Sequence, residues 1–135
     1  NIKSSTSSFS NYNKDSKWRK LKEFLLNGFG KSSFINLEKV NTITLDKFCK
    51  KNKISKIDLL KIDTEGHERE VLEGGKKVLK NKTEYVLIEF HLSKIYQNYN
   101  FQKIDKILKN KKFKLIKKFK FPFLAFEDRI YKKIN

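Results

Sequence analysis

The chain has 135 residues and a mass of 16.1 kDa, which is enough for one domain and too few for two. Hydrophobic residues make up 38% of it, so a packed core is expected and a disordered tail is excluded. The single cysteine, Cys49, excludes an internal disulfide framework and a cysteine-built zinc site. No apolar run approaches the roughly 20 residues that a membrane helix needs, and no signal segment is visible. We therefore expect a cytoplasmic protein without a membrane partner.

Basic residues dominate the charge, with 32 Lys and Arg against 15 Asp and Glu and a formal net charge of +17. Such a charge suggests nucleic acid as a partner, but only three of the basic residues are Arg, which is preferred for bidentate phosphate and base contacts. The charge is also uneven, because residues 61–91 carry six basic and seven acidic side chains. We expect a solvated basic surface without specific nucleic-acid binding, and the acidic middle becomes the candidate functional region.

The first third of the chain is predicted to hold a loop, a helix and an extended stretch. Residues 1–13 are rich in Ser and Asn and show no periodicity, which is typical of a loop. A helix is predicted from Ser16 to about Asn27, with Trp18, Leu21 and Leu25 at helical spacing. We group this loop and helix as residues 1–35, ahead of an α/β core over residues 40–135, which begins with an alternating extended stretch at 40–45.

A short helix and two buried strands are predicted next. The helix follows Asp46 and ends at Asn52, and its inner face carries Phe48 and Cys49. Residues 57–62 (IDLLKI) are largely apolar, as in a strand that is buried on both faces. The second strand, residues 85–88 (YVLI), continues into Glu89, Phe90 and His91.

Helical segments are predicted on either side of the second strand. Val71, Leu72, Val78 and Leu79 share one helical face, and Gly74-Gly75 predicts a kink or two short helices there. Residues 101–110 have the pattern of an amphipathic helix. Residues 113–119 and 124–131 predict two strands that form an antiparallel pair. Strands that alternate with helices indicate parallel βαβ units, so the predicted fold class is α/β.

Ionisable side chains gather at the ends of the two buried strands. The first strand is followed by Asp63, Glu65 and His67, and the second ends in Glu89 and His91. Ligands of open parallel sheets bind at the carboxyl ends of the strands, so these five residues would meet if the strands are neighbours. Such a group suits a general base for a hydroxyl, or a divalent cation held by oxygen ligands.

Structural roles are the alternatives for the same residues. Asp63 can cap the next helix, and Glu65 can accept backbone N–H groups at its start. His67 and Glu68 can face solvent in the first helical turn. Glu89 is harder to explain in this way, because a carboxylate at a buried strand end needs a partner.

Four blocks of the sequence together resemble one enzyme family. They are Thr44-Leu45-Asp46, the segment LLKIDTEGHE over residues 59–68, the segment VLEG over residues 71–74, and a strand that ends in Ile88-Glu89. In these blocks the chain is similar to the FkbM-type methyltransferases, which use S-adenosylmethionine to methylate hydroxyl groups of sugars, polyketides and surface glycans. The resemblance covers roughly residues 4–92.

The resemblance implies the C-terminal portion of a Rossmann-like class I methyltransferase sheet. Residues 40–45 would be its third strand, residues 57–62 the fourth, residues 85–89 the fifth, and the tail the sixth and seventh. The family's first strand and the glycine-rich turn after it, which build most of the cofactor site, have no counterpart here. The resemblance thus implies an incomplete domain with an open edge at residues 57–62, and it leaves the cofactor-binding residues unassigned.

The resemblance also implies roles for the acidic residues. Asp63, Glu65 and Glu89 would orient or deprotonate the acceptor hydroxyl, with His67 or His91 as an alternative base. A magnesium-like ion shared by Asp63 and Glu89 is left open as a second cofactor. The expected function is O-methylation of a sugar, glycan or secondary-metabolite hydroxyl by a fragment of such an enzyme. A catalytically inactive interaction module is the first alternative, and a basic nucleic-acid-binding domain is the second.

Overall fold

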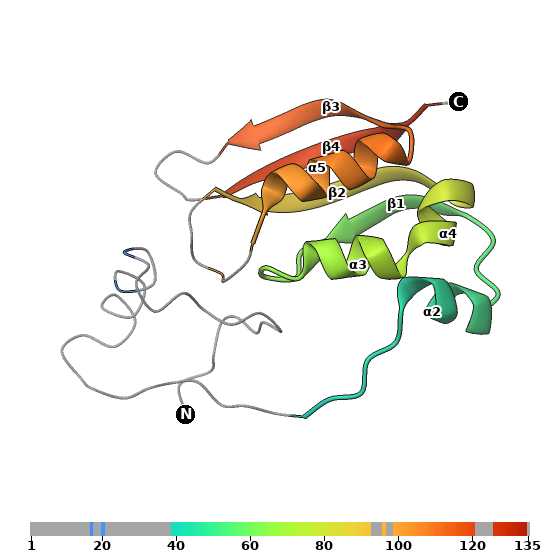
Figure 1. Ribbon diagram of the computed structural model, residues 1–135. Coiled ribbons are helices and arrows are strands. Elements are labelled where there is room, and N and C mark those ends of the chain that lie inside the picture. The colour runs from blue at the N-terminus through green and yellow to red at the C-terminus, as the bar shows by residue number, and fades with distance from the viewer. Residues whose placement is uncertain are drawn as a thin grey trace.

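One four-stranded mixed sheet organises the part of the chain that the computed structural model describes (Figure 1). The described residues are 39–92, 96, 99–120 and 126–134, together with positions 17 and 20. The strands of the sheet are β1 (Ile57–Ile62), β2 (Thr83–His91), β3 (Phe113–Lys120) and β4 (Phe126–Lys133). They lie in the order β1-β2-β4-β3. β1 is parallel to β2, whereas β4 is antiparallel to both β2 and β3, so the predicted α/β class and the terminal antiparallel pair are confirmed.

Within residues 39–134, four helices are described that precede or connect these strands. They are α2 (Leu45–Lys51), α3 (Glu68–Gly74), α4 (Lys76–Asn81) and α5 (Phe101–Asn110). The Thr44 side chain accepts a hydrogen bond from the Lys47 N–H at the start of α2, and Asn100 caps α5 in the same way. The predicted break at Gly74-Gly75 is confirmed by the division into α3 and α4. A Cβ atom on Gly75 would lie 2.8 Å from Leu45 Cδ2, so glycine permits the close approach of α2.

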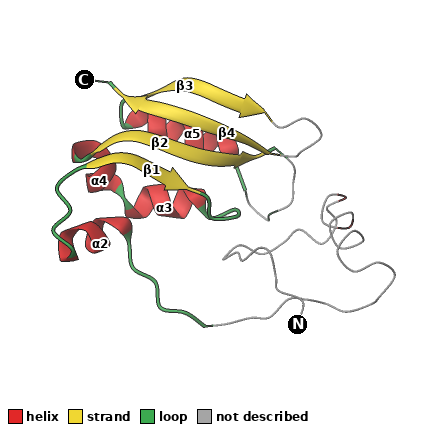
Figure 2. Ribbon diagram, turned by 180° about the vertical axis from the view of Figure 1, so that it is seen from behind, coloured by secondary structure: helices red, strands yellow, loops and turns green. Residues whose placement is uncertain are grey.

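The hydrophobic core fills the space between the sheet and α3, α4 and α5, which lie on one face of it (Figures 1 and 2). Its buried members come from β1, β2, β3, β4 and the three helices: Ile62, Leu72, Leu79, Val86, Ile88, Phe90, Ile104, Leu108, Phe113 and Tyr131. Among the described residues no helix lies over the opposite face, which is turned to the viewer in Figure 2. Leu59 on β1 is 55% exposed. The prediction that β1 is buried on both faces is therefore wrong, because helices cover one face and β1 has a paired neighbour only on its β2 side within the described residues.

The segment before α2 also differs from its prediction. Residues 40–44 form no strand, and Leu45 already belongs to α2, so the strand expected at 40–45 is wrong. In α2, Cys49 is buried as predicted, but Phe48 is 44% exposed. The predicted loop at 1–13 and most of the predicted helix at 16–27 lie outside the described residues; positions 17 and 20 are helical. No described helix has both the length and the apolar character needed to span a membrane.

Candidate active site

The carboxyl ends of β1 and β2 bring together most of the predicted site residues. The parallel register pairs Ile62 with Ile88, so the chain after β1 runs beside the last residues of β2. Ligand atoms of Glu65, Glu89 and His91 all lie within 4.8 Å of one another. Together with their neighbours Asp63 and Glu68, we call these residues the strand-end cluster. The expectation that the two strands are adjacent, and that their polar ends meet, is confirmed.

The turn between β1 and α3 holds Glu65 in this cluster. Glu65 and Gly66 both have left-handed backbone conformations, with φ angles of 51° and 97°. A Cβ atom on Gly66 would lie 2.5 Å from Cγ of Tyr96, so the turn needs glycine for its φ angle and for its contact with the Tyr96 ring. The Tyr96 hydroxyl donates a hydrogen bond to Oε2 of Glu65. The turn and Tyr96 therefore fix the side chain of Glu65 from two sides.

Glu68 is the buried carboxylate that organises this turn. Its Oε1 accepts hydrogen bonds from the Thr64 N–H at 3.2 Å, the Thr64 hydroxyl at 3.2 Å and the Gly66 N–H at 3.0 Å. The side chain is completely buried, so the alternative in which Glu68 faces solvent is wrong. A carboxylate near the N-terminus of a helix, four residues after a threonine, was the available signal for such a role. Glu68 thus accepts the backbone N–H groups of Thr64 and Gly66 in the turn that precedes α3.

Glu89 is a member of the strand-end cluster with a strongly raised pKa. Burial, followed by the negative charges of Asp63, Glu65 and Asp128, raises the pKa of Glu89 from 4.5 to about 7. Asp128 lies directly opposite Glu89 on β4, and burial together with Asp63 raises the pKa of Asp128 against the opposing effect of Lys61. A carboxyl group that is divided between its two protonation states near neutral pH is typical of functional sites.

Aromatic side chains fix His91, which is only 5% exposed. The rings of Tyr96 and Tyr99 meet the imidazole edge-on, with centroid distances of 4.8 and 5.4 Å. The Tyr99 hydroxyl accepts a hydrogen bond from the backbone N–H of His91 at 3.1 Å. Nε2 of His91 lies 3.6 Å from Oε1 of Glu89 and 4.0 Å from Oε1 of Glu68. The two tyrosines were not predicted, because nothing in their sequence spacing relates them to the strand ends.

Asp63 and His67 occupy the outer part of the site. Oδ2 of Asp63 lies 3.0 Å from Nζ of Lys61, and its side chain is 39% exposed. Asp63 does not cap α3, whose N-cap position is His67 without a side-chain capping bond. Nδ1 of His67 lies 3.7 Å from Oε2 of Glu70, and His67 is not part of the group of ligand atoms formed by Glu65, Glu89 and His91. Four of the five predicted residues thus gather at the strand ends, while His67 interacts along α3.

Comparison with models of protein families identifies the family to which the chain belongs. The family model of the methyltransferase FkbM domain matches residues 2–115, which is most of the chain. The chain belongs to the FkbM methyltransferase family. All five predicted site residues lie within the matched range, so the resemblance noted in the sequence is confirmed. No curated protein and no solved structure gives a significant match to the chain.

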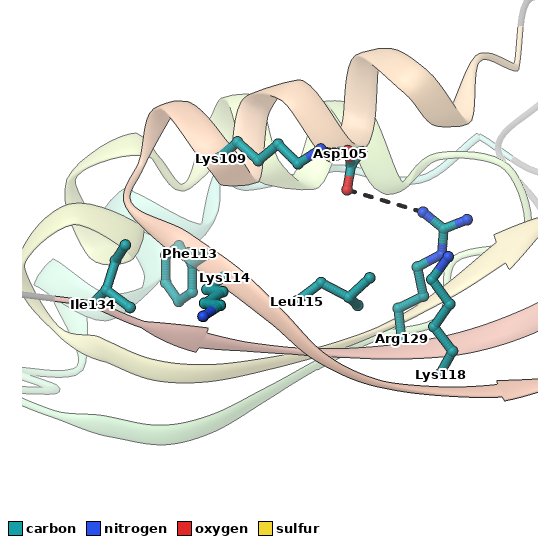
Figure 3. A pocket seen from close by; sticks show the side chains of 8 residues that line it. All are labelled: Asp105, Lys109, Phe113, Lys114, Leu115, Lys118, Arg129 and Ile134. Atoms are coloured by element: carbon teal, nitrogen blue, oxygen red, sulfur yellow. Dashed lines mark ion pairs between the residues drawn. The ribbon is translucent and has the colours of Figure 1, made fainter.

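A second group of charged side chains in this FkbM chain lies beneath α5. A pocket of about 470 Å³ opens there between α5, β3 and β4 (Figure 3). Asp105 and Arg129 face each other across it, with Oδ1 and Nη1 3.9 Å apart. Nε of Arg129 also donates a hydrogen bond to Glu127, and the Tyr131 hydroxyl donates one to Asp105 at 2.7 Å. Each buried charge in this group has an opposite partner, and β4 lies outside the range that the family model matches, so the strand-end cluster is the better candidate site.

Proposed function

We propose that this FkbM methyltransferase chain supplies the acceptor-side carboxylates of an S-adenosylmethionine-dependent O-methyltransferase. The acceptor is a hydroxyl group of a sugar, glycan or secondary metabolite. The observation that carries the proposal is the convergence of Asp63, Glu65 and Glu89 at the carboxyl ends of two parallel strands, where α/β sheets bind their ligands. The family match supports methyl transfer as the reaction.

The carboxylates suit both reaction partners. S-adenosylmethionine would supply the methyl group from a positively charged sulfonium, and the negative charges of Asp63 and Glu89 favour a cation beside them. Asp63 is the more exposed of these two carboxylates, so it is accessible to an acceptor hydroxyl. The ion pair with Lys61 restrains Asp63 in this position.

The step itself is a displacement at the methyl carbon. The acceptor oxygen forms the new C–O bond while the C–S bond breaks, and the bonding electron pair stays on sulfur. The hydroxyl proton passes to the Asp63 carboxylate, which acts as the general base. Base catalysis of this kind contributes ~10²–10⁴-fold, and most of the remaining acceleration comes from positioning.

The test uses the natural protein with this sequence, at full length, and replaces Asp63 in it. Asp63→Asn keeps the size of the side chain but removes the base, so methyl transfer to a panel of hydroxyl acceptors should fall by ~10²–10⁴-fold. The matched control is Asp58→Asn, because Asp58 is an exposed aspartate on the same strand whose partner is Lys56. Transfer is followed with a labelled methyl donor, and thermal unfolding checks that both variants fold.

Unchanged transfer in Asp63→Asn would contradict the role of Asp63. Failure of the unaltered protein to bind S-adenosylmethionine or to methylate any acceptor would instead favour the inactive interaction module.

A further inference from the structure

The geometry of the strand-end cluster fits a metal ion. Glu65, Glu89 and His91 each offer one ligand atom, and these atoms lie within 4.8 Å of one another. Carboxylate oxygens and imidazole nitrogens bind divalent metals at about 2.0–2.2 Å, so two ligands of one ion lie at most about 4.4 Å apart. The three side chains would therefore have to move inward by only about half an ångström. The rings of Tyr96 and Tyr99 pack edge-on against His91, whose Nε2 lies 3.6 Å from Oε1 of Glu89.

The buried carboxylate of Glu68, close to His91, is a second and independent indication. Glu68 is completely buried, and its Oε2 makes no hydrogen bond within the described residues. Its Oε1 accepts hydrogen bonds from the N–H groups of the turn and lies 4.0 Å from Nε2 of His91. A buried carboxylate oxygen without a donor destabilises the folded state, and a cation next to it removes that cost. Glu68 therefore places a buried carboxylate, with one oxygen unbonded among the described residues, next to His91, and a cation bound to His91 would balance its charge.

We propose that Glu65, Glu89 and His91 bind a divalent first-row transition-metal ion, with the Glu68 carboxylate as the buried counter-charge beside it. The imidazole nitrogen favours Zn²⁺, and Mn²⁺ binds such a mixed site more weakly through its carboxylates, whereas Ca²⁺ and Mg²⁺ prefer sites made of oxygen alone. This site differs from a magnesium-like ion shared by Asp63 and Glu89. Asp63 contributes no atom to the group and is held by Lys61.

The ion also has a place in the chemistry, and this part of the inference rests on the proposed function. An acceptor oxygen bound to the ion loses its proton more readily, because the metal charge stabilises the alkoxide. Glu65 and Glu89 are then ligands, and Asp63 beside them remains as the base. The metal site thus gives different roles to three carboxylates that the sequence alone does not distinguish: Glu65 and Glu89 bind the ion, and Asp63 accepts the proton.

The first experiment measures metal binding directly, without methyl donor or acceptor. Zn²⁺ and Mn²⁺ are titrated calorimetrically into the chelator-treated protein, with Mg²⁺ and Ca²⁺ for comparison. We expect one Zn²⁺ or Mn²⁺ per chain and binding of Mg²⁺ and Ca²⁺ that is at least about tenfold weaker. Glu65→Gln and His91→Gln should each weaken Zn²⁺ binding by at least about tenfold. The matched control is His67→Gln, because His67 is the other histidine of the sequence and lies outside the group of ligand atoms.

A second measurement uses the unaltered protein, so that it does not depend on how the variants fold. Substoichiometric Mn²⁺ should broaden the amide NMR signals of residues 65–68 and 89–91 before all others. Broadening that begins at residues far from the strand ends, or equal affinities in Glu65→Gln, His91→Gln and His67→Gln, would overturn the site. Intact metal binding without methyl transfer would contradict only the proposed function.

Discussion

Two clusters of charged side chains in this protein differ in how their charges balance. In the Arg129 cluster (Asp105, Lys109, Glu127, Arg129 and Tyr131), Arg129 bonds to Glu127, and Lys109 lies 2.6 Å from Asp105. Although burial opposes it, Lys109 and Tyr131 hold the pKa of Asp105 below its usual value. In the strand-end cluster the carboxylates instead repel one another, and the pKa of Glu89 rises to about 7.

The difference separates a structural cluster from a functional one. In a balanced buried group each charge replaces the water that it lost with an opposite partner, so removing one charge leaves the other buried without compensation. A group of like charges destabilises the folded state. We therefore expect that such a group has a role in binding or catalysis. Removing the charge of Arg129 from the first cluster and that of Glu89 from the second should therefore have opposite effects on stability.

The largest effect is expected from Arg129→Met. The substitution keeps an apolar stem but leaves Glu127 and Asp105 without their shared cation, and Glu127 is only 2% exposed. We expect the free energy of unfolding to fall by about 3–5 kcal/mol, as measured by urea denaturation. Arg69→Met is the control, because Arg69 forms exposed ion pairs along α3 and should change stability by less than about 0.5 kcal/mol. A similar decrease in the free energy of unfolding in both variants would show that the buried charges of the Arg129 cluster contribute no more than exposed ion pairs do.

A smaller loss is expected from Glu68→Ala. Glu68 belongs to the strand-end cluster, but its Oε1 accepts three hydrogen bonds from the turn. Without it the N–H groups of Thr64 and Gly66 lose their acceptor, so the free energy of unfolding should fall by about 2–3 kcal/mol. Glu73→Ala on the exposed side of α3 is the control, with an expected change below about 0.5 kcal/mol. A neutral effect of Glu68→Ala would mean that the turn keeps its shape without this carboxylate.

Regular elements with a strong apolar pattern could be predicted from the sequence. The bounds of β1 and α5 agree with residues 57–62 and 101–110, because their apolar residues follow one clear pattern and polar residues end it. The strand expected at residues 40–45 fails for a physical reason. Alternation describes an extended chain, but a strand also needs a hydrogen-bonded neighbour, and Thr44 caps a helix instead.

The candidate site could be predicted in part, because its position follows from topology. Carboxyl ends of adjacent parallel strands meet, and this rule alone places Glu89 close to Asp63. The burial of Glu68 could not be predicted, since it depends on a turn with left-handed backbone at Glu65 and Gly66. This turn packs on Tyr96, which lies 30 positions beyond Gly66 in the chain. Only the folded structure therefore shows that the turn and Tyr96 are in contact.

The smallest and most informative effect is expected from Glu89→Gln, because it should be stabilising. In the folded chain Glu89 holds a proton with a pKa of about 7, against 4.5 for an ordinary glutamate. Folding is therefore favoured below pH 4.5, and this contribution is lost as the pH rises to about 7. A neutral glutamine avoids the loss. After allowance for solvent screening, the free energy of unfolding at about pH 8 should rise by about 1 kcal/mol in the presence of a chelator.

The pH dependence distinguishes this electrostatic explanation from a simple gain in packing. Between pH 4.5 and 7 the unaltered chain should lose stability relative to Glu89→Gln, whereas Glu84→Gln on the exposed part of β2 should follow the unaltered chain. A stabilisation by Glu89→Gln that is equal at both ends of this range would contradict charge repulsion as its cause. A destabilisation at about pH 8 would show that the negative charge of Glu89 is balanced in the folded chain, as the charges of the Arg129 cluster are. If Glu89→Gln instead raises the free energy of unfolding and Arg129→Met lowers it, the two clusters have different roles. The loss of one charge then relieves repulsion in the strand-end cluster, whereas in the Arg129 cluster it leaves carboxylates without their cation.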